Sequence, residues 1–156
     1  MLQVDIPGRG LLQLSYLVLD YNGTMALDGH LLPGVGSLLA KISEILEIHV
    51  VTADTFGLAR QGLSGLPASL SVLGPSGQTA AKQRFVEVLG PERTCAVGNG
   101  RNDCLMLKAS ALGLAVIGPE GASQASVSQA DLVCPDIGAA LGLLLNPLRL
   151  VAGLRD

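Results

Sequence analysis

The chain has 156 residues, of which 49% are hydrophobic and 15% charged, with 20 glycines, no tryptophan and a formal net charge of −3. This length is enough for a proper core, and we expect one domain over residues 1–156. The charge excludes a basic field for nucleic acid. The apolar stretches 109–119 and 137–147 are too short and too broken by Gly and Pro to span a bilayer.

Apolar runs alternate along the chain in a pattern typical of strands and helices. An N-terminal β-hairpin is expected from Leu2–Ile6 and Leu11–Leu19 around the turn signal Pro7–Gly10. The further expected strands are Ile48–Thr52, Leu70–Leu73, Cys95–Val97, Gly113–Ile117 and Leu132–Cys134, and the expected helices are Leu38–Leu46, Leu58–Leu63, Gln78–Leu89, Asp103–Ala109, Ala122–Gln129 and Ile137–Leu145. This alternation predicts an α/β fold, a Rossmann-like parallel sheet with helices on both faces.

The first chemical signal is Asp20, which ends the apolar run Leu17–Leu19 and precedes the turn Tyr21–Thr24. Open α/β sheets place their chemistry at the carboxyl ends of strands, so Asp20 is a candidate nucleophile or metal ligand. The glycine of this turn can adopt backbone angles closed to other residues, and backbone N–H groups there could hold phosphate oxygens. The alternative is an aspartate that only caps a turn.

A second strand runs into the Gly-rich turn Gly98-Asn99-Gly100-Arg101-Asn102-Asp103. Its carboxylate and amides are oxygen ligands of the kind that Mg²⁺ accepts, and they could meet Asp20 at one edge of the sheet. Helix capping is the alternative role for Asn102 and Asp103.

Two further residues fit a phosphate site. Thr52 ends the apolar strand Ile48–Thr52 and could donate a hydrogen bond to a phosphate oxygen, although threonine is also a common strand residue. Lys82 lies in the helical stretch Gln78–Leu89, in which an apolar stripe is formed by Ala81, Phe85, Val88 and Leu89. A solvated surface lysine is the alternative for Lys82.

In order and spacing, Asp20, Thr52, Lys82 and Gly98–Asp103 resemble the four motifs of the haloacid dehalogenase superfamily of phosphohydrolases. The chain is most similar in these motifs to the phosphorylation domain of P-type ATPases, which carry Asp-Lys-Thr-Gly-Thr and Gly-Asp-Gly-x-Asn-Asp. The resemblance covers about Tyr16 to Asp136. It implies a soluble, cytoplasmic, Mg²⁺-dependent phosphohydrolase or phosphotransferase that forms an aspartyl-phosphate on Asp20 and acts on a phosphorylated substrate.

The resemblance also implies roles for individual residues. The catalytic positions are Asp20, Asn22, Thr52 and Lys82; the phosphate-binding positions are Gly23, Thr24, Thr52, Lys82 and Asn102; the metal positions are Asp20, Asn22, Asn99 and Asp103. Two of these depart from the family. Phosphatases have an acid/base Asp where this chain has Asn22, and a metal-binding acid where it has Asn99. We therefore expect slow turnover, because an amide does not exchange a proton usefully near neutral pH.

The segments from Asp20 to Thr52 and from Thr52 to Lys82 are too short for a cap domain, and Met25–Leu32 forms at most a small flap. The apolar tail Leu143–Val151 is expected to be a final helix packed on the protein's own sheet, or else a contact with a second copy or a protein partner that would roof the open site. His30 is a loop histidine or a substrate contact.

His49 is expected in the core. Three cysteines without ligand spacing indicate reduced thiols, and Asp5 interrupts any signal peptide at the start of the chain.

The sequence is compatible with three hypotheses of function. The first is the phosphohydrolase, the second a phosphate- or nucleotide-binding module with little turnover, and the third a regulatory subunit that interacts with a partner such as a transporter. The residues Asn22 and Asn99 favour the second and third. The first is favoured by the intact motif residues Asp20, Thr24, Thr52, Lys82 and Asp103.

Overall fold

The computed structural model describes residues Met1–Asp156 and centres on a six-stranded parallel sheet in the order β10-β9-β8-β3-β6-β7. The strands are β3 (Tyr16–Leu19), β6 (Glu47–Thr52), β7 (Ser69–Val72), β8 (Thr94–Gly98), β9 (Leu112–Val116) and β10 (Leu132–Cys134). Because all six run the same way, their carboxyl ends meet at one edge. The expected Rossmann-like architecture is confirmed.

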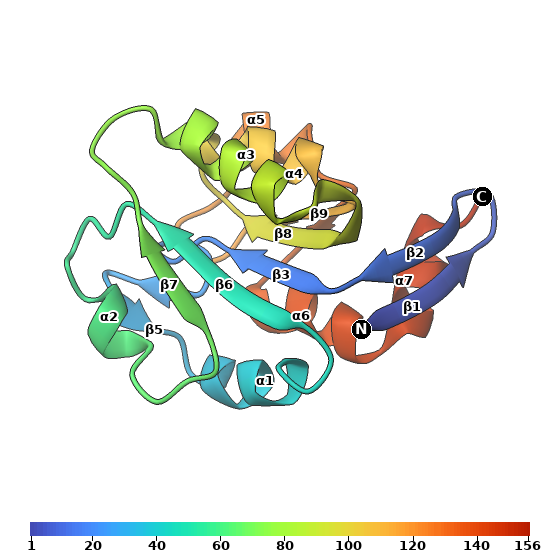
Figure 1. Ribbon diagram of the computed structural model, residues 1–156, viewed down its shortest axis with the longest axis horizontal. Helices are drawn as coiled ribbons and strands as arrows, with labels where there is room; N and C mark the ends of the chain where they lie inside the picture. The colour runs from blue at the N-terminus through green and yellow to red at the C-terminus, as the bar shows by residue number, and fades with distance from the viewer.

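Helices cover both faces of this sheet (Figure 1). On one face lie α3 (Gln78–Leu89), α4 (Cys104–Ala109) and α5 (Gln124–Val127); on the other lie α1 (Val35–Ile42), α2 (Ala59–Gly62) and α6 (Ile137–Leu145). Short 3₁₀ helices η1 (Pro91–Arg93) and η2 (Arg101–Asp103) flank β8. The α1 helix begins after Gly34, whose left-handed φ of 81° suits glycine, and it ends one turn earlier than the expected Leu46.

Two hydrophobic clusters follow from the alternation of side chains along the strands. In β3, Leu17 and Leu19 belong to the larger cluster, which includes buried residues of α1 and α6, whereas Val18 belongs to a smaller one with Val86 of α3 and Met106 of α4. The sheet is therefore buried on both faces, as a near-continuous aliphatic strand requires.

The expected strand Leu11–Leu19 is wrong as a single element. It divides at Ser15 into β2 (Gly10–Leu14), which pairs antiparallel with β1 (Leu2–Ile6), and β3 of the central sheet. Ser15 bridges β6 and the η1–β8 junction: its N–H donates to the carbonyl of Arg93 at 2.8 Å and its carbonyl accepts from Glu47 at 2.9 Å. The chain thus changes sheets without leaving backbone groups unpaired.

The chain after Asp20 forms only a small hairpin, β4 (Ala26–Leu27) with β5 (His30–Leu31), before it enters α1. At the C-terminal end, α6 and α7 (Pro147–Leu154) meet at 105° around Asn146. Leu150 is buried in the larger cluster, and α7 packs against β1 (Figure 1). No single helix is long and apolar enough to cross a membrane, although the bent pair α6–α7 has the length and composition when both are counted.

The apolar stripe predicted on α3 is only partly right. The residues that α3 buries fully are Lys82 and Val86, whereas Val88 is 81% exposed. Phe85 and Leu89 pack at the edge of the smaller cluster, where the Phe85 ring meets His49 edge-on at a centroid distance of 5.6 Å. The face of α3 that packs against the sheet therefore differs from the predicted one, because Lys82 forms ion pairs with two buried carboxylates.

Candidate active site

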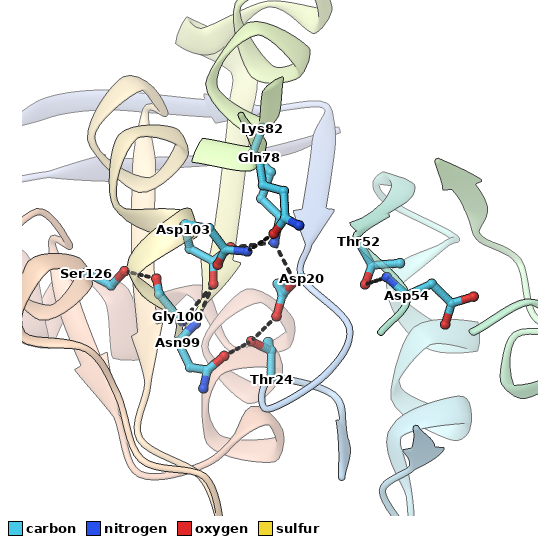
Figure 2. A network of polar contacts seen from close by, with 11 residues as sticks. Asp20, Thr24, Thr52, Asp54, Gln78, Lys82, Asn99, Gly100, Asp103 and Ser126 are labelled. Carbon is cyan, nitrogen blue, oxygen red and sulfur yellow. Dashed lines mark hydrogen bonds and ion pairs between the residues drawn. The ribbon is translucent and has the colours of Figure 1, made fainter. Parts of the chain in front are cut away.

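A cavity of about 310 Å³ opens at the carboxyl edge of the sheet. It is lined by Asp20, Asn22, Thr52, Ala53, Thr55, Phe56, Gln78, Asn99, Gly100, Asn102 and Glu120. These residues follow β3, β6, β8 and β9 and begin α3, so topology alone brings them together from distant parts of the sequence. The four motifs therefore meet at one place, as Figure 2 shows for their polar side chains.

Lys82 is the centre of a buried ion-pair network. Its Nζ lies 2.5 Å from Asp20 Oδ1 and 2.6 Å from Asp103 Oδ1, and its side chain has no exposed surface. A lysine is rarely buried in this way without partners, and here two carboxylates compensate its charge. The surface alternative for Lys82 is excluded, and the nucleophile candidate is held by a fixed cation (Figure 2).

The electrostatics of this network raise the pKa of Asp20 to about 7. Burial of the carboxyl is the largest cause of the higher pKa, the neighbouring Asp103 adds to it, and Lys82 opposes it. Burial also disfavours the charge of Lys82, but the attraction of Asp20 and Asp103 raises the pKa of Lys82 above its ordinary value. The lysine thus remains protonated while Asp20 titrates near neutrality.

Asp103 organises the turn after β8. Its Oδ2 accepts hydrogen bonds from the backbone N–H of Asn99 at 2.9 Å and of Gly100 at 2.8 Å, while Oδ1 accepts from Lys82. The carboxylate therefore fixes both the lysine and the loop that carries Asn99. The resemblance predicts a metal ligand at Asp103, and in this structure its two oxygens are engaged by protein donors.

Asn99 connects the turn that contains Asp20 and Thr24 to the loop after β9. The Thr24 hydroxyl lies 3.3 Å from Asp20 Oδ2 and 3.1 Å from Asn99 Oδ1, so it can donate to either oxygen. The Asn99 amide nitrogen donates to the carbonyl of Gly121 at 2.9 Å, and its backbone carbonyl accepts from Ser123 at 2.7 Å. An amide at this position supplies a donor that a carboxylate would lack.

The Gly23 turn needs glycine for two reasons. Its φ is +81°, and a Cβ there would lie 2.5 Å from Glu120 Oε2 and 2.6 Å from the Asn99 amide nitrogen. The N–H groups of Gly23 and Thr24 donate to Ala26 and Tyr21 at 2.7 and 3.3 Å. These two N–H groups were expected to face phosphate, but they are used inside the turn.

Asn22 is the one cavity residue with an unsatisfied buried side chain. Both the nitrogen and the oxygen of its amide are inaccessible and have no hydrogen-bond partner. Such groups are costly, typically about 1–3 kcal/mol each, and are rare without a functional reason. Asn22 also lines the cavity, so the hydrogen-bonding capacity of its amide is unused within the protein at this site.

Thr52 and Asn102 lie at the walls of the cavity. Thr52 Oγ accepts from the backbone N–H of Asp54 at 3.0 Å, which leaves the hydroxyl proton free for a bound oxygen. Asp54 has φ of +50° and caps the next turn by accepting from Ala59. Asn102 donates to Gln78 Oε1 at 2.9 Å.

Sequence reasoning did not predict five of the cavity residues, which are Ala53, Thr55, Phe56, Gln78 and Glu120. Glu120 follows an apolar strand, the same placement that pointed to Asp20, and that signal could have found it. Among histidine, cysteine and acidic side chains, no group of three or more converges in a way that could hold a metal ion.

Comparison with solved structures defines the fold. The chain superposes on the cobalt-bound deoxy-D-mannose-octulosonate 8-phosphate phosphatase of Haemophilus influenzae with a TM-score of 0.72 and 15% identity, covering 90% of this chain and 92% of that one. The Moraxella catarrhalis 3-deoxy-D-manno-octulosonate 8-phosphate phosphatase, solved with magnesium, phosphate and KDO, superposes with a TM-score of 0.62 and 14% identity. The match covers 91% of this chain and 87% of that one. The catalytic domain of the CPx-ATPase CopB-B superposes with a TM-score of 0.57 and 22% identity, over 74% of this chain and 46% of that one.

The fold is thus that of the haloacid dehalogenase superfamily, and it is similar to a P-type ATPase catalytic domain. No family model matches the sequence. An uncharacterised protein of Methanocaldococcus jannaschii is 46% identical over 80 residues, which span 49% of this chain and 86% of that protein. The chain belongs to the same family as this archaeal protein.

Proposed function

We propose that the protein is a Mg²⁺-dependent phosphohydrolase or phosphotransferase in which Asp20 accepts the phosphoryl group. The observation that supports this most is the placement of Asp20: it ends a central strand, lines the cavity, and is held by the buried cation of Lys82. The superposed phosphatases have the same fold, which agrees with this proposal.

In the proposed reaction, a carboxylate oxygen of Asp20 forms a bond to phosphorus while the bond from phosphorus to the ester oxygen breaks. The leaving oxygen takes that electron pair and then a proton from solvent. Lys82 donates two of its three N–H bonds to Asp20 and Asp103 and does not line the cavity, so in this proposal it acts on the phosphoryl group through Asp20. The free proton of the Thr52 hydroxyl can be donated to a phosphate oxygen.

A divalent cation fits the electrostatics of the site. Three carboxylates, of Asp20, Asp103 and Glu120, are offset by the single charge of Lys82, and no lysine or arginine lines the cavity. A phosphate dianion would be repelled without a further cation. Asp20 Oδ2, the Asn99 amide oxygen and the Asn22 backbone carbonyl would hold it, and Asp103 would act mainly through Lys82. When bound, Mg²⁺ neutralises charge on the transferring phosphoryl group.

Asn22 makes hydrolysis of the aspartyl-phosphate slow in this proposal. A positioned acid or base typically contributes about 10²–10⁴-fold to such a step, and an amide cannot supply it. The same residue supports the second candidate, a phosphate- or nucleotide-binding or regulatory interaction module with little or no catalysis. Its unpaired buried amide could hydrogen-bond a ligand without turning it over.

Hydrolysis of p-nitrophenyl phosphate with and without Mg²⁺ separates the two candidates. We expect slow, Mg²⁺-dependent turnover that Asp20→Asn abolishes, while Asp5→Asn on the distant hairpin retains it. Turnover by the Asp20→Asn variant at the parent rate would refute the nucleophile. Saturable phosphate binding with no turnover in the parent would favour the binding module.

A further inference from the structure

The turn after β8 offers no free carboxylate to a cation bound beside Asp20 and Asn99. Asn99 is neutral, and both oxygens of Asp103 accept hydrogen bonds from Lys82 and from the turn itself. Hard divalent cations are held more tightly as the number of charged oxygen ligands rises. With Asp20 alone, this side of the cavity would offer one carboxylate to a cation.

The loop Gly118–Gly121 brings a second carboxylate to the same place. It turns sharply at Gly118 and Gly121, whose φ angles are +56° and +73°. Asn99 stabilises the loop: its side-chain amide nitrogen donates to the carbonyl of Gly121, and the backbone N–H of Ser123 donates to the Asn99 carbonyl. Glu120 Oε2 and both amide atoms of Asn99 lie within 2.9 Å of the position that a Cβ of Gly23 would occupy.

Nothing in the protein compensates the charge of Glu120. It forms no ion pair, although it lines a cavity that already contains the carboxylate of Asp20. Glu120 is exposed, and Asp20 shares its one cationic partner, Lys82, with Asp103, so the negative charge of these carboxylates exceeds the charge of that lysine and would attract a divalent cation. The hydrogen bond from the Asn99 amide nitrogen to Gly121 explains why the charge lies in the loop, since an acid at position 99 could not make that bond.

We propose that Glu120, held in place by Asn99, supplies the second carboxylate of the divalent-cation site, in place of an acid at position 99. This inference rests on the proposed function, because it assigns the cation to the Asp20 cavity. It gives Asn99 a positioning role through the loop, in addition to any contact of its own amide oxygen with the cation.

Calorimetric titration of the substrate-free protein with Mg²⁺, with Mn²⁺ binding followed by electron paramagnetic resonance, tests this assignment without any activity measurement. Glu120→Gln should weaken binding by at least about tenfold, and Glu120→Asp should keep affinity within about threefold of the parent. Glu92→Gln, an exposed glutamate on η1 away from the cavity, is the matched control and should bind as the parent does. Melting curves of each variant verify the fold.

The possible outcomes separate this inference from the proposed function. If Glu120→Gln binds with the affinity of the parent while Asp20→Asn loses binding, Glu120 has no such role and the cation site at Asp20 stands. If Asp20→Asn also binds as the parent does, or if the parent itself does not bind, the cation lies outside this cavity or is absent. Either result overturns the proposed function as well.

Discussion

Replacing Asp20 by asparagine should stabilise the metal-free protein increasingly as the pH rises. Burial and the neighbouring Asp103 raise the pKa of Asp20 from 3.8 to about 7 in the folded protein. Folding therefore favours the protonated carboxyl. Its stabilising contribution is complete below pH 3.8 and is lost as the pH rises toward about 7, where the buried group must ionise.

This rise of the pKa from 3.8 to about 7 corresponds to about 4 kcal/mol over the whole range, of which about 2–3 kcal/mol falls between about pH 5 and pH 8. The asparagine side chain of the Asp20→Asn variant is neutral at every pH and nearly isosteric with a protonated aspartate. The stability advantage of Asp20→Asn should therefore grow by about 2–3 kcal/mol over this interval, or roughly 5–10 °C in Tm.

Urea and thermal unfolding followed by circular dichroism, in the presence of a chelator at about pH 5 and pH 8, measure this growth directly. Asp5→Asn, on the exposed face of the hairpin, controls for the loss of a carboxylate as such. A difference between Asp20→Asn and the parent that stays constant or shrinks between the two pH values would refute the electrostatic reasoning. Added Mg²⁺ should remove most of the advantage, because a cation offsets the charge of ionised Asp20.

Other changes test other parts of the site. Lys82→Met leaves Asp20 and Asp103 without their buried cation and should cost about 3–5 kcal/mol of unfolding free energy at neutral pH in urea titrations, whereas an unchanged midpoint would contradict the ion-pair network. Asn22→Asp should raise phosphatase turnover by about tenfold or more and shorten the lifetime of the phospho-protein in a chase experiment; equal or lower turnover with an intact fold would favour the binding module. Asn99→Asp should tighten Mg²⁺ binding in calorimetry, because the added carboxylate outweighs the loss of the hydrogen bond to Gly121 that positions Glu120, and it should lower the Tm of the metal-free protein by placing a charge near Asp20; weaker binding would count against a direct contact between residue 99 and the cation.

Much of the sheet is predictable from the sequence because its strands are buried on both faces. Runs such as those of β3 and β8 are short, uncharged and mainly apolar stretches that end in polar turns, and the pattern identifies both the strand and its functional edge. The break at Ser15 could not be predicted in this way. The residues on both sides are rich in leucine, and only pairing with β1, β6 and β8 decides which sheet each half joins.

In the candidate site, too, the features set by local sequence were predictable, and those set by tertiary contacts were not. Asp20 and Thr52 are evident as polar residues at strand ends. The orientation of α3 was missed because helical periodicity assigns Lys82 to the polar side, whereas two buried carboxylates turn it inward. The internal use of the Gly23 and Thr24 N–H groups depends on how the chain returns to Ala26, which no local pattern specifies.

The central claim is that Asp20 forms a covalent bond to phosphorus, and intact-protein mass spectrometry after incubation with acetyl phosphate and Mg²⁺ tests it most directly. Acetyl phosphate has a good leaving group, so the missing proton donor at Asn22 limits this first step least. We predict a mass gain of one phosphoryl group that tandem spectrometry locates on Asp20, that hydroxylamine removes and that Asp20→Asn lacks. No mass gain, or the same gain in Asp20→Asn, would contradict the claim.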